Sequence, residues 1–170
     1  MCIECFEKLP RFYYKEREYI TWQDDEVCRV GFSEIPDIGN KEINVKVMSE
    51  AAIKAAKKKP LFLKNAVDVC LIDKIKNKTY TFTIKMYYDY DGASIARIFW
   101  RIIGSKENIE FKVAALIHDV LCENHHYVDN DRYFADRVFE RLLEVGDVGP
   151  FRRWLMFHTV DNFQKFCGWD

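Results

Sequence analysis

The stretch AVDVCLIDKIKNKTYTFTIKMYY, residues 66–88, decides the fold class of this chain. Both of its halves alternate in polarity and are rich in Val, Ile, Thr, Tyr and Phe, the residues that are enriched in β-strands. The polar residues Lys76, Asn77 and Lys78 separate the two halves. The pattern therefore predicts a β-hairpin.

The chain that follows the hairpin has the periodicity of helices. FKVAALIHDVLCE (residues 111–123) and DRYFADRVFERLLEV (131–145) each place apolar residues on one helical face, and RRWLMFHTVDNFQKF (152–166) continues in the same way. A loop is predicted at residues 89–94, and a short helix at 95–103. Strands followed by a packed bundle of about three helices predict an α+β fold.

The segment before the hairpin, residues 1–62, is expected to hold short strands and one helix. The residues at 20–22 and 27–32 are predicted as strands, and those at 36–40 as a turn or loop, because that stretch contains Pro, Gly and Asn. Ser49 is a predicted N-cap. The Ala-rich helix that it opens is expected to stop at Pro60.

Composition limits the classes of function. The 170 residues suit one globular domain, and an aromatic content of 15% lets the chain bury a sizeable core. A formal net charge of -1 argues against a general polyanion binder, so no nucleic-acid partner is expected. No apolar run approaches the ~20 residues of a transmembrane helix. The charged N-terminus shows no signal peptide, and six scattered cysteines favour a reduced protein.

Two of the predicted helices carry polar residues that need partners. His118 and Asp119 lie in the middle of the apolar helix 111–123, where an unpaired polar group is costly. Asp136 lies at the edge of the apolar face of helix 131–145. If the two helices are antiparallel neighbours, Asp136 can reach His118, fix the tautomer of the imidazole and favour its protonated form.

A loop carboxylate completes a candidate metal site. Asp91 and Gly92 lie in the predicted loop, and glycine lets a backbone carbonyl approach an ion closely. Neighbouring residues on a helix diverge by about 100°, so Asp119 can hold a cation while His118 transfers a proton. The carboxylates of Asp91 and Asp119 with the Gly92 carbonyl form an all-oxygen set, which favours calcium over zinc.

Each candidate residue also has a structural interpretation, and the sequence leaves both open. His118 is then a satisfied core histidine, and Asp119 pairs with a nearby Lys or Arg. Asp136 is then an i,i+4 partner of Arg132, and Asp91-Gly92 is only a turn. Other hydrolase schemes fit less well. An HD-type phosphohydrolase needs a His before the His-Asp pair, and none is present; HExxH, GxSxG and Walker motifs are also absent.

The stretch from about Ala66 to Trp169 resembles the uncharacterised bacterial and phage family DUF1353. Members of that family show a DGAS-I-P segment and a Trp, then AALIHD-x-L, AD-x-x-F and a closing helix with an LMY-like start. This chain has the corresponding segments in the same order: Asp91–Ile95, Trp100, Ala114–Leu121, Ala135–Phe139 and Leu155–Phe157. It departs from the pattern at Ala96 and Cys122. The resemblance implies a DUF1353-like domain over residues 63–170, in one continuous globular unit with the unmatched segment 1–62.

A more distant resemblance suggests an activity. The order of Asp loop, His-Asp, Asp-x-x-Phe and closing helix is similar to secreted phospholipases A2 of the prokaryotic type, and two of these pieces look like the phospholipase domain of parvovirus capsids. The resemblance implies that His118 is a general base and that Asp136 orients it. It further implies that Asp91, the Gly92 carbonyl and Asp119 bind calcium. The disulfides that flank the dyad helix in those enzymes have no clear counterpart here.

Three functions therefore stay open. The first is a calcium-dependent hydrolase of phospholipase A2 type, acting on a lipid or another ester. The second is a non-catalytic phage or prophage structural protein, such as a tail-associated component that contacts other virion proteins. The third is a metal-dependent hydrolase of another substrate. Since no signal peptide is seen, the cytoplasm of a bacterial host or the phage virion is the expected location.

Overall fold

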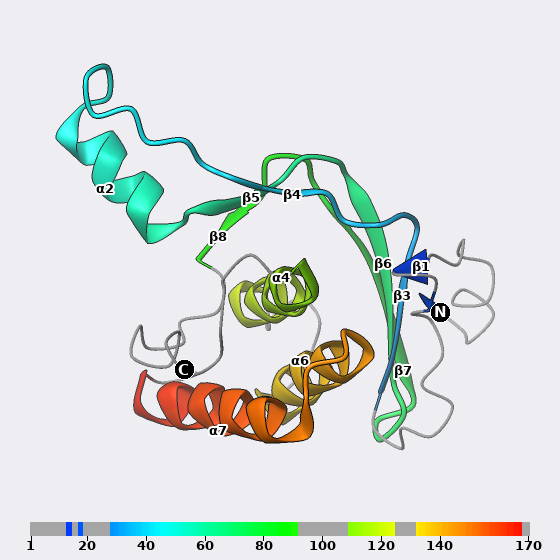
Figure 1. The fold of residues 1–170 in the computed structure, drawn as a ribbon. Helices are drawn as coiled ribbons and strands as arrows, with labels where there is room; N and C mark the ends of the chain where they lie inside the picture. Colours follow the sequence, from blue (N-terminus) through cyan, green and yellow to red (C-terminus); the bar gives the residue numbers. More distant parts are fainter. Residues whose placement is uncertain (1–12, 15–16, 19–27, 92–108, 125–131, 168–170) are drawn as a thin grey trace.

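Strands occupy the first half of the chain and helices the second, so the expected α+β class is confirmed (Figure 1). In this computed structural model, the described residues are 13–14, 17–18, 28–91, 109–124 and 132–167. The elements are β1 (Tyr13–Tyr14), β2 (Arg17–Glu18), β3 (Cys28–Phe32), β4 (Ile38–Asn40), α2 (Glu50–Lys58), β5 (Leu61–Leu63), β6 (Val67–Asp73), β7 (Lys78–Ile84), β8 (Asp89–Tyr90), α4 (Ile109–Glu123), α6 (Arg132–Val145) and α7 (Pro150–Cys167).

The main sheet has the strand order β3-β6-β7, and both pairings are antiparallel. The predicted hairpin is confirmed as β6 and β7, with Asn77 in the left-handed region (φ 50) at the turn, which Asn tolerates better than most residues. The strand predicted at residues 27–32 is confirmed as β3, which pairs with β6. The strand predicted at 20–22 and the helix predicted at 95–103 lie outside the described residues.

A second sheet, with the order β4-β5-β8, corrects two of the predicted loops. Residues 38–40 of the predicted loop 36–40 form β4, and residues 89–90 of the predicted loop 89–94 form β8. Both strands pair with β5. Glycine, a residue typical of turns, is needed within β4 at position 39. A Cβ on Gly39 would lie 2.9 Å from the Phe62 ring of β5, so only glycine allows this approach.

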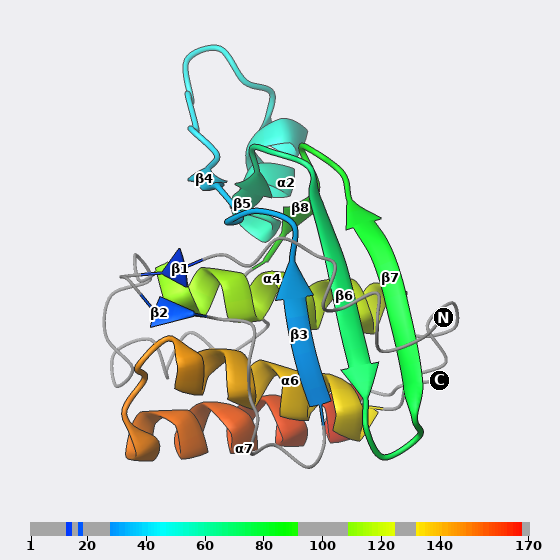
Figure 2. The ribbon, with the colours of Figure 1, turned by 90° about the vertical axis from the view of Figure 1, so that its right-hand side faces the viewer.

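Helix α2 extends from this second sheet, away from the other described helices (Figures 1 and 2). The predicted N-cap is confirmed, because the Oγ of Ser49 accepts a hydrogen bond from the backbone N–H of Ala52 at 3.3 Å. The helix ends at Lys58, two residues before Pro60, as the sequence predicted. Ala56 is the buried residue of this helix. Most of its surface therefore faces solvent.

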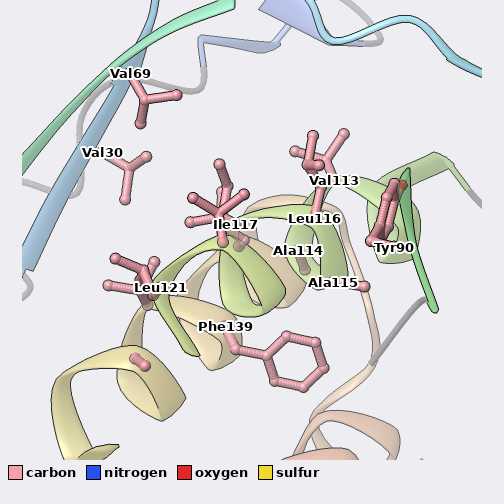
Figure 3. Packing of buried hydrophobic residues seen from close by; sticks show 14 of the residues in the cluster. Val30, Val69, Tyr90, Val113, Ala114, Ala115, Leu116, Ile117, Leu121 and Phe139 are labelled. Atoms are coloured by element: carbon pink, nitrogen blue, oxygen red, sulfur yellow. The ribbon is translucent and has the colours of Figure 1, made fainter. Parts of the chain in front are cut away.

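The helices α4, α6 and α7 pack in layers beside the main sheet (Figure 2). Figure 3 shows Val30 and Val69 of the sheet pointing toward Ile117 and Leu121 of α4. Helix α4 is apolar on almost all sides because it is enclosed between the sheets and α6. Within the described ranges, none of the helices has the length and apolar character needed to span a bilayer.

Candidate functional site

His118 and Asp136 form a buried pair between α4 and α6. The Nε2 atom of His118 lies 3.1 Å from Oδ1 of Asp136, and the two residues are 3% and 1% exposed. The two helices run antiparallel. Phe111, which precedes His118 on α4, packs on Phe139, which follows Asp136 on α6. This packing places a carboxylate behind the imidazole, in an environment where each polar group needs its partner.

Further contacts hold Asp136 and the ring in position. Oδ2 of Asp136 lies 3.6 Å from Nη1 of Arg132, one turn earlier on α6. Arg132 also bonds to Asp161 of α7, so its guanidinium links two helices. The ring of Phe139 packs against the His118 ring at a centroid distance of 5.3 Å. Asp136 thus has the Arg132 contact that a structural role requires, but it lies in the core and not on a solvated face.

The second ring nitrogen of His118 faces two partly exposed residues of its own helix. Nδ1 lies 3.6 Å from Sγ of Cys122 and 3.8 Å from Oδ1 of Asp119. Cys122 follows His118 by one helical turn and Asp119 is its direct neighbour, so the spacing along α4 sets both distances. The side of the imidazole opposite Asp136 is therefore the side that lies nearer to solvent.

These neighbours change the proton affinity of the ring. Burial lowers the pKa of His118, but the hydrogen bonds to Asp119, Asp136 and Cys122 raise it, and the result is a pKa well above the ordinary value of 6.5. The two carboxylates flank the imidazole from opposite ring nitrogens. The folded protein therefore holds a proton on His118 more strongly than an unfolded chain does.

The predicted calcium ligands are only partly described. Asp91 directly follows β8 and is partly buried, whereas Gly92 lies outside the described residues. The Asp119 carboxylate lies near β8, since its charge adds to the effect of burial in raising the pKa of Tyr90. Among the described side chains, no group of three or more His, Cys, Asp or Glu residues is placed to hold a metal ion. The set Asp91, Gly92 and Asp119 therefore stays a prediction.

A network of charged residues, which the sequence did not indicate, lies beside this site. Glu123, at the end of α4, accepts hydrogen bonds from Nζ of Lys59 at 2.8 Å and from the hydroxyl of Tyr88 at 2.7 Å. Lys59 also lies 3.9 Å from Asp89, which pairs with Lys41. The partners are 30 to 64 residues apart in the sequence, so no local pattern could reveal them.

Cys122 is the other residue that sequence reasoning missed. The sequence marks it only as a departure from the family pattern, although its spacing of four residues from His118 places both on one helical face. Cys122 is partly exposed, whereas Cys70 of β6 is buried. Helical spacing was the signal that could have identified it.

Comparison with known proteins assigns this region to one family. The profile of the family described as "Protein of unknown function (DUF1353)" matches residues 67–160, which include the whole His118–Asp136 pair. No curated protein and no solved structure matches the chain. A function must therefore be inferred from the geometry of the site.

Proposed function

Because the chain belongs to the DUF1353 family, whose description names no function, we propose an activity from its site: a calcium-dependent ester hydrolase of phospholipase A2 type. In this proposal His118 is the general base and Asp136 orients it. The observation that carries the proposal is the 3.1 Å contact between His118 Nε2 and a fully buried carboxylate of Asp136.

The contact supports a separate role for each ring nitrogen. Asp136 accepts a hydrogen bond, so it favours the tautomer with the proton on Nε2. Above the raised pKa of His118 the ring is neutral, and Nδ1 then holds a lone pair on the partly exposed side of the helix and takes a proton from an attacking water. Asp136 also stabilises the imidazolium that this step creates, as carboxylates do in other His-Asp pairs.

Asp119 supports the calcium part of the proposal. Its carboxylate lies 3.8 Å from Nδ1, beside the place where the attacking water would stand. With Asp91 and the carbonyl of Gly92 it offers oxygen donors alone, the chemistry that calcium prefers. Bound calcium would polarise the ester carbonyl and stabilise the oxyanion. A lipid ester as substrate rests on the motif order that resembles phospholipases A2.

A second candidate function uses the same pair with a different nucleophile. Sγ of Cys122 lies 3.6 Å from Nδ1 and 3.7 Å from Nε2 of His118, so Cys122, His118 and Asp136 lie together as the members of a cysteine hydrolase triad do. In that reaction the imidazole takes the thiol proton, and the thiolate attacks the acyl carbonyl and expels the leaving group. Water then hydrolyses the thioester. Unlike the calcium hydrolase and the metal-dependent hydrolase of another substrate, this reaction needs no metal ion.

The test measures hydrolysis of phosphatidylcholine by the purified chain in millimolar calcium and in excess chelator. His118→Gln should lower the rate ~10² to 10⁴-fold, the usual contribution of a general base. His158→Gln is the matched control, since His158 is the other histidine of the described residues and packs on Trp154 of α7. Cys122→Ala should leave the rate unchanged under the first candidate and abolish it under the second.

Three outcomes reject the calcium hydrolase. One is a wild-type protein that hydrolyses no phosphatidylcholine in calcium. Another is activity that His118→Gln retains. The last is a melting temperature that millimolar calcium leaves unchanged, because a ligand that binds the native state raises it. A folded protein without any hydrolase activity favours the non-catalytic phage role instead.

A further inference from the structure

A positively charged extension projects from the second sheet. It consists of residues 41–59, the loop after β4 together with α2, and is called the basic arm below. These residues include six lysines and two glutamates, a net charge of +4 in a chain whose formal net charge is -1. Figures 1 and 2 both show the basic arm reaching away from α4, α6 and α7. Charge of one sign is thus concentrated on a protruding part of the molecule.

The lysines of the basic arm fall into two groups. Lys41 and Lys59, at its base, form ion pairs with Asp89 and Glu123. The outer lysines are not paired with any acidic side chain in the described parts of the chain; they are Lys46, Lys54, Lys57 and Lys58. Lys41 and Lys59 therefore attach the basic arm to β8 and α4. The charges of the outer lysines are available to a binding partner.

Aliphatic side chains are exposed on the loop of the same arm. Val45 is 70% exposed and Val47 is 80% exposed, and Ile43 is 37% exposed. Exposed aliphatic side chains are unfavourable in water. Val45 and Val47 flank Lys46 in the sequence. The basic arm therefore carries exposed aliphatic side chains beside Lys46, in addition to the lysines of α2.

We propose that the basic arm binds the surface of an anionic lipid bilayer. Lysines near such a surface are attracted by its negative potential, and small apolar side chains enter the interface. Single-stranded nucleic acid is the other polyanion to consider, but its binding relies on aromatic stacking and on arginine. The basic arm contains neither arginine nor an aromatic residue.

The attachment of the arm gives this binding a consequence for the candidate site. Lys59 is bonded to Glu123, the residue that follows Cys122 on α4. The base of the basic arm therefore lies beside the end of α4. That a lipid ester reaches His118 from a bilayer held by the basic arm rests on the proposed function, whereas the binding itself does not.

Co-sedimentation with vesicles tests the binding. We use the full chain carrying His118→Gln, so that hydrolysis cannot alter the lipid. It should bind vesicles that contain phosphatidylglycerol and not vesicles of phosphatidylcholine alone. Each lysine near an anionic surface contributes roughly fivefold in partitioning, so Lys57→Gln with Lys58→Gln should weaken binding roughly 25-fold.

The matched control is Lys76→Gln with Lys78→Gln at the turn of the β6–β7 hairpin, away from the arm (Figure 2). It removes the same charge and should leave vesicle binding unchanged. Val45→Ser with Val47→Ser removes no charge and should also weaken binding. Thermal melts followed by circular dichroism verify that each variant is folded.

The proposal is overturned if phosphatidylglycerol does not increase binding, or if the hairpin control weakens it as much as the arm variant does. Binding to single-stranded DNA that depends on Lys57 and Lys58, without vesicle binding, would also overturn it in favour of nucleic acid. Vesicle binding by a wild-type chain that hydrolyses no lipid would contradict the proposed function alone.

Discussion

Two charged contacts lie little more than one turn apart on α4, and they have opposite surroundings. The side chains of His118 and Asp136 are 4% and 2% exposed, whereas those of Glu123 and Lys59 are 45% and 34% exposed. A buried pair has lost its water and depends on its partner, while an exposed pair can exchange its partner for water. Similar contact distances therefore predict very different energies.

Removal of the buried carboxylate should have the largest effect on stability. Asp136→Ala leaves His118 without its partner in the core, and we expect the free energy of unfolding to fall by about 3–5 kcal/mol. Urea denaturation measures the change. Glu140→Ala on the same helix is the control, because its partly exposed pair with Arg137 should contribute less than about 1 kcal/mol. Equal losses of unfolding free energy in Asp136→Ala and Glu140→Ala would show that burial does not distinguish the two ion pairs.

A rise in pH should have a smaller effect, because it removes the proton and keeps both side chains. Burial lowers the pKa of His118, but hydrogen bonds to Asp119 and Asp136 raise it above 6.5. The stabilisation is therefore fully present below pH 6.5 and is lost as the pH rises through the folded-state pKa. Urea denaturation in chelator between pH 6 and 9 should show this loss for the wild type. A His118→Gln variant with the same slope would contradict it.

The exposed contact should respond least. Glu123→Gln keeps the size of the side chain and removes its charge, and we expect a loss of less than about 1 kcal/mol. Salt should reduce the difference between the variant and the wild type further, since exposed charges are screened. Thermal melts at low and high sodium chloride measure both effects. A loss as large as that of Asp136→Ala would show that Glu123 is effectively buried.

The elements that sequence could predict are those whose signal is local. The hairpin, α2, α4, α6 and α7 follow from alternation, capping and helical periodicity within one window of sequence. The second sheet could not be predicted, because β4 and β8 are two or three residues long and pair with β5 across the chain. The turn-forming residues around Gly39 indicated a loop, whereas glycine is needed there for close approach to Phe62.

The candidate site follows the same rule. The contact of His118 with Asp136 was predictable, because each is a polar residue within an apolar helix and had to find a partner. The charged network was not, since Lys59 and Glu123 are 64 residues apart and both suit a solvated surface. Whether Asp91, Gly92 and Asp119 bind one calcium stays a prediction, and calcium titration of the melting temperature tests it.

The pairing of β3 with β6 bears on how this family domain can be produced in isolation. The matched segment begins at residue 67, but β3 lies before it and covers one edge of β6 along five residues. A fragment limited to residues 67–160 would expose that edge of β6. Open edges recruit strands from other molecules, so the excised fragment should form aggregates and resist crystallisation.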